Sequence, residues 1–251
     1  MNRPRTAGLP LLLLACLLLP ACANLPQVGV VPVTGLETPI PEGTAPALDI
    51  HNHRGSVTVV VDPKALGPDV RAVPRSGHPI EQEVRWTAAS MSLDSGLPVL
   101  RILSTPQDTG APDTPVDITV TLPAVGGVRV RNEDGLVTLR DVRGAIEVHS
   151  SLPFNDGPAI FIQTRHAITA PMLLISQAGG IEVRMGRGSA GQIVASAEQG
   201  TVTVDAARAE TKNVRVEKGV YTATLNDGEH EHRISTQAGN VTVLVGKGFQ
   251  P

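Results

Sequence analysis

Cysteine and aromatic residues are scarce in this sequence. Only Cys16 and Cys22 occur in the 251 residues, and aromatic side chains make up 2% of the chain. Both cysteines lie near the N-terminus, so a chain cut after Ala21 keeps no pair of thiols for a disulfide or a cysteine zinc site. The shortage of aromatic rings argues against a surface that stacks nucleic-acid bases or sugars.

An excess of basic residues is also missing. The formal net charge is −3 and the pI is about 6.2, which excludes the electrostatic footprint of a nucleic-acid-binding protein. The sequence contains no G-x-S-x-G nucleophile elbow and no P-loop. The sequence therefore has no motif of a serine hydrolase with a nucleophile elbow or of a P-loop nucleotide-binding enzyme.

The N-terminus has the features of an export signal. Two arginines precede an apolar run over Leu9–Leu19, which is too short for a stable membrane-spanning helix. The stretch LLPAC, Leu18–Cys22, resembles a bacterial lipoprotein signal. The resemblance implies cleavage before Cys22, lipidation of that cysteine and, because Ala23 follows it, outer-membrane sorting. Cys16 in LLAC and an ordinary secreted protein cut at the same place remain alternatives.

The composition divides the chain into three parts. Residues 1–21 are the predicted signal, and residues 22–46 are a proline-rich segment that we interpret as a tether. Residues 47–251 are rich in Val, Ile and Thr and contain frequent glycines, which predicts one all-β domain of short strands. Within it, residues 63–127 are less regular.

A repeat organises the predicted domain. Each copy has a glycine with an apolar residue five positions before it and others two and four positions after it, as in Ile50, Gly55, Val57 and Val59. The anchoring glycines are Gly55, Gly135, Gly144, Gly179, Gly200, Gly219 and Gly239. The last four are 21, 19 and 20 residues apart.

This spacing predicts a β-solenoid. Apolar alternation after the glycine places one face of a strand in the core, and glycine permits a sharp corner. Strand, corner and strand at a period of about 20 residues form one rung, and stacked rungs share a core. The alternative is an antiparallel β-sandwich of hairpins, because EDG, EQG and EKG also suit tight hairpin turns.

Three stretches resemble the putative-adhesin β-solenoid domains of bacterial surface and envelope proteins. They are Arg131–Val148, Ser196–Val204 and Ser235–Val243, with a lead-in over Val116–Val130. The resemblance covers roughly residues 47–247. It implies a solenoid in the cell envelope, and the family has no agreed catalytic residues.

Two His-x-His pairs are the best candidates for chemistry. Ile50 faces the predicted core, so His51 and His53 share the outward face of their strand and can chelate copper, zinc or nickel. The pair is similar to the copper ligands of copper superoxide dismutases. That likeness implies further ligands, for which His230 and His232 are candidates, and Arg54 could steer an anion.

Two functional hypotheses follow. The first is an envelope lipoprotein, held to the membrane by its lipid, whose rigid scaffold binds other envelope proteins or itself. The second is a copper-only superoxide dismutase that protects the envelope. Neither predicts nucleic-acid binding.

Overall fold

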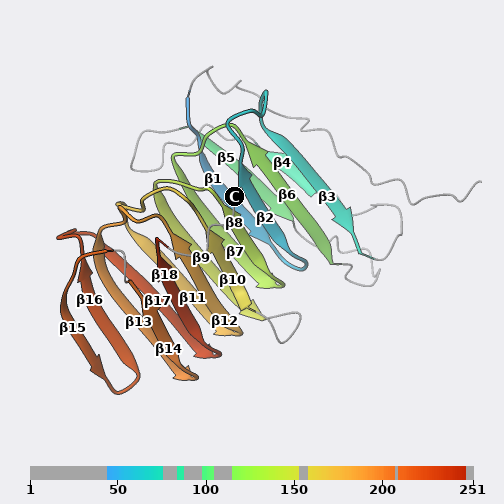
Figure 1. Cartoon of the computed structure of the whole chain (residues 1–251). Helices are drawn as coiled ribbons and strands as arrows, with labels where there is room; N and C mark the ends of the chain where they lie inside the picture. Colours follow the sequence, from blue (N-terminus) through green and yellow to red (C-terminus); the bar gives the residue numbers. More distant parts are fainter. Residues whose placement is uncertain are drawn as a thin grey trace, which may run out of the picture.

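The computed structural model describes residues 44–75, 84–87, 98–104, 115–152, 158–206 and 209–246. These residues form an all-β protein without helices, as the composition predicts (Figure 1). No helix among them is long and apolar enough to cross a membrane. The predicted signal, Cys22 and nearly all of the predicted tether lie outside the described residues.

The strands form two sheets, which we call sheet A and sheet B. Sheet A contains, in spatial order, β15 (Thr211–Glu217), β16 (Val220–Leu225), β13 (Gly191–Gln199), β17 (Glu231–Ala238), β11 (Met172–Ala178), β9 (Ala145–Leu152), β7 (Gly127–Asp134), β1 (Ala47–Asn52), β5 (Val99–Ser104) and β4 (Val84–Thr87). Sheet B contains β14 (Val202–Asp205), β18 (Val241–Val245), β12 (Gly180–Met185), β10 (Pro158–Gln163), β8 (Val137–Arg140), β2 (Val57–Val61), β6 (Val116–Leu122) and β3 (Asp69–Pro74).

The stack is a β-solenoid, and the solenoid prediction is confirmed. Neighbouring strands within the stack are parallel and in register, so that Ile50 lies beside Ile102 on one side and Val130 on the other. All three are fully buried, together with the valines two and four residues after Gly55. Stacked layers therefore share one continuous core between the sheets.

Glycine is required where the chain turns from one sheet to the other. Gly55 and Gly135 have φ values of +107° and +126°, which L side chains rarely adopt. A Cβ on Gly55 would overlap the backbone of Val116, and one on Gly135 would overlap the backbone of Gly55. The corners therefore stack so closely that no side chain fits between them.

A buried row of polar side chains supports these corners. Three positions before the corner glycine, Asn52 and Asn132 donate through Nδ2 to the carbonyls of Gly55 and Gly135 at 3.0 and 2.8 Å. The in-register members of the row are Ser104, Asn52, Asn132, Ser150, Ser176, Thr236 and Ala197. Asn52, Asn132, Ser176 and Thr236 thus donate to backbone carbonyls at the corners, whereas Ser150 Oγ has no hydrogen-bond partner among the described residues and Ala197 has no donor.

The layers do not stack in the order of the chain. The first layer, β1 and β2, lies between β5/β6 and β7/β8. The last layer, β17 and β18, lies between β11/β12 and β13/β14. Each terminal layer is thus inserted between two layers that follow one another in the chain. Figure 1 shows the dark red β18 inside the stack rather than at its end.

The predicted rung at Gly219 is wrong. Val214 belongs to β15, Tyr221 belongs to β16, and Gly219 lies in the turn between these strands, which pair antiparallel as a hairpin at the edge of sheet A. Lys218 and Gly219 both have positive φ, at +47° and +78°, which is the geometry of a two-residue hairpin turn. The hairpin alternative therefore holds for EKG, whereas EDG and EQG form corners.

The less regular region contains one ordinary layer. Within residues 63–127, β5 and β6 form a parallel layer beside β1 and β2. β4 and β3 then add one antiparallel strand to each sheet. The irregular spacing therefore reflects the end of the stack.

Candidate functional site

His51 and His53 lie on the outer face of sheet A, as their spacing predicts. Their side chains are 45% and 36% exposed, and Glu133 on the adjacent β7 lies between them. Glu133 contacts His53 Nδ1 and lies 3.6 Å from His51 Nε2. Two imidazoles and one carboxylate thus face the same side of the sheet and are of residue types that bind metals, although these three described side chains are not arranged as a metal site.

The second histidine pair is not near the first. β17, which carries His232, is four strand positions from β1 in sheet A, or roughly 19 Å at about 4.8 Å per strand. His232 is fully buried, and its ring Nε2 lies 3.0 Å from the carbonyl oxygen of Ala190. One ion cannot be shared by His51, His53, His230 and His232.

His232 is a core residue. Burial lowers its pKa, and the nearby His230 lowers it further, although the contact with the Ala190 carbonyl opposes both effects. The neutral ring donates through Nε2 to that carbonyl, and Nδ1 has no hydrogen-bond partner among the described residues. The inward parity of Ile234, two positions later, would have predicted this burial.

The other predicted charges are paired with neighbours. Arg54 Nε lies 3.2 Å from Asp134 Oδ2, so its charge is balanced locally. His149 lies two strands from His51, with Arg131 between them in register. Among the described residues, no group of three or more His, Cys, Asp or Glu side chains is arranged to hold a metal ion.

A shallow groove crosses the outer face of sheet A. Its volume is about 240 Å³. The floor follows a row of small residues, in which Ala47 is in register with Gly127 and Gly127 with Ala145. Pro171 and Leu173 close one end. We call this feature the sheet A groove.

Charged and apolar side chains border the sheet A groove. Arg129 on β7 donates from Nε to Glu147 Oε2 on β9 at 2.9 Å, so the charges on this rim neutralise each other. Ile175 lies on the outer face two residues beyond Leu173, in register with His149. The outer face of sheet A therefore carries in-register rows of side chains and contains an apolar depression.

The groove was not predicted from the sequence, although the repeat contains a signal for it. Ala47, Gly127 and Ala145 each lie three residues before an inward apolar residue, and Pro171 holds the same place before Leu174. The corresponding residues of the next layers are Glu231 and Gln192. Aligning the copies on that position would have shown where small residues give way to polar ones.

Comparison with known proteins identifies a similar architecture. No protein-family model and no curated protein sequence matches the chain. A crystal structure from Clostridium sporogenes, described as a "putative cell adhesion protein", covers 82% of this chain and 96% of its own, with a TM-score of 0.51 and 10% identity. The two proteins share a fold. At this identity the likeness extends to the stacked architecture and not to individual side chains.

Proposed function

We propose that this protein is a lipoprotein of the bacterial cell envelope, anchored through Cys22, whose solenoid binds another envelope protein. The signal-like N-terminus supports export and lipidation. The structure from Clostridium sporogenes is described as a "putative cell adhesion protein", which is consistent with an interaction role. The lipid would place the molecule at the outer membrane or cell surface.

The sheet A groove is the observation that carries this proposal. It lies on a face of parallel, in-register strands whose inner side is packed into the core. Such a face is rigid, so little conformational entropy is lost when a partner binds. A depression lined by Ala145, Pro171 and Leu173 fits an apolar anchor residue of a partner, while Arg129 and Glu147 offer polar contacts at the rim.

A photo-crosslinking amino acid at Ala145 in intact cells tests this role. We expect a discrete adduct with an envelope protein. The adduct should disappear when Leu173→Glu places a charge in the groove. Leu244→Glu is the matched control, because Leu244 lies on the outer face of sheet B, in register with Arg184. Equal loss with both variants, or no adduct at Ala145, would contradict the proposal.

The alternative is a copper-dependent superoxide dismutase. The observation in its favour is the common orientation of His51 and His53 beside Glu133. Copper content after loading, measured with superoxide turnover, tests it against the His51→Ala/His53→Ala double variant. His149→Ala is a control, since that histidine is on the same face. Unchanged copper content in the double variant would end this alternative.

A further inference from the structure

The two sheets end at different strands at one end of the stack. β13 and β14 form the last complete layer. Sheet B ends there, at β14, whereas sheet A continues through β16 and β15. We call these two additional strands, residues 211–225, the overhang. Among the described residues, sheet B has no strand opposite the overhang.

The inner face of the overhang is apolar, and it is exposed on β15, whereas Ala223 and Leu225 of β16 are buried. Tyr221 pairs with Ala195, which is fully buried, so Tyr221 faces the core side. Val216 pairs with Tyr221 and so faces the same side, and Val214 lies two residues earlier, within a register shift between Lys212 and Arg215. Val214 and Val216 are nevertheless 52% and 70% exposed. They point to where sheet B would continue if it were as long as sheet A.

β14, the last strand of sheet B, is also incompletely covered at this end. Its inward residues Val202 and Val204 pair with Val241 and Val243 of β18. The β18 valines are fully buried, whereas those of β14 are only partly buried. Among the described residues, β14 and β15 each have one strand neighbour, so each presents an unpaired backbone edge.

We propose that a second copy of this chain closes this end through a two-fold axis parallel to the strands. The overhang of each copy would extend sheet B of the other beyond β14, because sheet A is two strands longer than sheet B at this end. β14 of one copy would then pair with β15 of its partner, and the reverse pairing would follow by symmetry. The exposed valines of both overhangs would be buried against each other.

The strand directions agree with this pairing. β15 is antiparallel to β16, and β16 is antiparallel to β13, so β15 runs in the direction of β13. The corner at Gly200 returns the chain in β14. A two-fold axis along the strands preserves their directions, so β14 meets the partner's β15 as an antiparallel neighbour.

Side-chain chemistry selects a register for the new pair. Inward residues must oppose inward residues across an antiparallel ladder. Placing Val204 opposite Val216 of the second copy also places Asp205 opposite Arg215, which adds an opposite-charge pair on the outer face. The dimer rests on the proposed interaction role, and it makes a second copy of the chain one of the protein's binding partners.

Disulfide crosslinking of the full chain tests the geometry. Val204→Cys protein mixed with Val216→Cys protein should give a covalent heterodimer under mild oxidation. Wild type measures any background from Cys16 and Cys22, and Leu66→Cys mixed with Val216→Cys is the control at an exposed residue outside the overhang. A heterodimer equally strong in the Leu66 control, its absence from the 204–216 mixture, or a dominant 216–216 adduct would overturn the proposal.

Solution mass provides a second test. The wild-type chain should sediment as a dimer at micromolar concentration, and Val214→Glu/Val216→Glu should sediment as a monomer. Leu66→Glu should remain dimeric. A monomeric wild type, or a dimer that survives the double variant, would contradict the proposal. Photo-crosslinking at Ala145 uses the other surface, so the two proposals can fail separately.

Discussion

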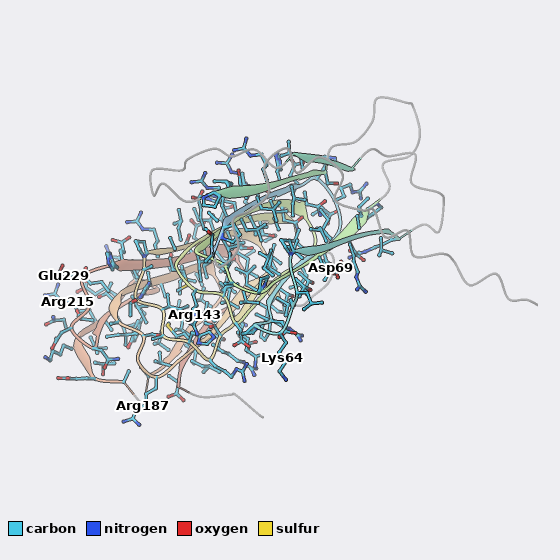
Figure 2. All side chains as sticks on the ribbon, turned by 90° about the horizontal axis from the view of Figure 1, so that it is seen from above. Lys64, Asp69, Arg143, Arg187, Arg215 and Glu229 are labelled. Carbon is cyan, nitrogen blue, oxygen red and sulfur yellow. The ribbon has the colours of Figure 1, made fainter. Side chains whose placement is uncertain are left out.

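The two ends of the stack are built from the same kind of element with different results. At one end, β3 and β4 add one antiparallel strand to each sheet, and the inward Val70 and Ala72 of β3 are buried. At the other end, two antiparallel strands extend sheet A alone, and Val214 and Val216 stay exposed. Asp69, where β3 begins, and Arg215 of β15 lie toward opposite ends in Figure 2. In this protein the inward residues of the outermost antiparallel strand are therefore buried only at the end where the facing sheet is equally long.

The largest effect that distinguishes the ends should come from a charge on an inward residue of each terminal strand. Ala72→Asp places a carboxylate in a fully buried position of β3, which we expect to lower the free energy of unfolding by about 3–5 kcal/mol. Val216→Asp should change it by less than about 0.5 kcal/mol in the monomer, because its side chain is mostly in water.

Urea unfolding of each monomeric variant measures this difference. Ala72→Val is a control for side-chain size at the first position. If Val216→Asp destabilises the monomer as much as Ala72→Asp, the overhang is covered in solution and the contrast between the ends does not exist.

A smaller effect should follow the buried polar row. Asn132→Ala removes the 2.8 Å hydrogen bond to the Gly135 carbonyl, which should cost about 1–3 kcal/mol because that carbonyl is at a tight corner. The layer next to the overhang has Ala197 in the same row. Ala197→Ser should therefore be close to neutral. Equilibrium unfolding that ranks the two changes in the opposite order would show that the row does not hold the corners.

The smallest effect is the pH dependence of stability that His232 of β17 causes. The folded-state pKa of His232 is lowered, so the unfolded chain binds the proton more readily. The stabilisation is complete above about pH 6.5 and is lost as the pH falls below that value. We expect unfolding free energy to decrease by at most about 1.4 kcal/mol per pH unit between pH 6.5 and 5.

His232→Gln separates this effect from general acid sensitivity. Glutamine can still donate to the Ala190 carbonyl but does not titrate in this range. The variant should show a shallower dependence on pH, measured by urea unfolding at several pH values. His149→Gln is the control, because His149 lies on the outer face of sheet A, two strands from β17. Identical slopes in His232→Gln and wild type would assign the pH dependence to other groups.

The sequence was sufficient to predict the stacked all-β fold, because period and alternation are local properties. It did not distinguish the corner at Gly239 from the hairpin at Gly219, which lie 20 residues apart with similar apolar spacing. Both positions need a glycine with positive φ, and the hairpin is set by Lys218, which also adopts positive φ. A conformation of that kind in a lysine has no strong sequence signal.

The site was only partly predictable for a related reason. The outward direction of His51 and His53 follows from the two-residue period of a strand. Which strands become neighbours does not follow, because each copy has the same inward pattern and fits beside any other. The roughly 19 Å between the histidine pairs and the alignment of Ala47 with Gly127 both depend on the observed layer order.

The insertion of the terminal layers gives the chain a late folding step. A simple solenoid can grow by adding each new layer to the previous one as the chain emerges. Here β11 and β13 become neighbours of β17 only when the last residues arrive, so the stack cannot be completed from one end. The chain would therefore stay incompletely folded until β17 and β18 are available for insertion.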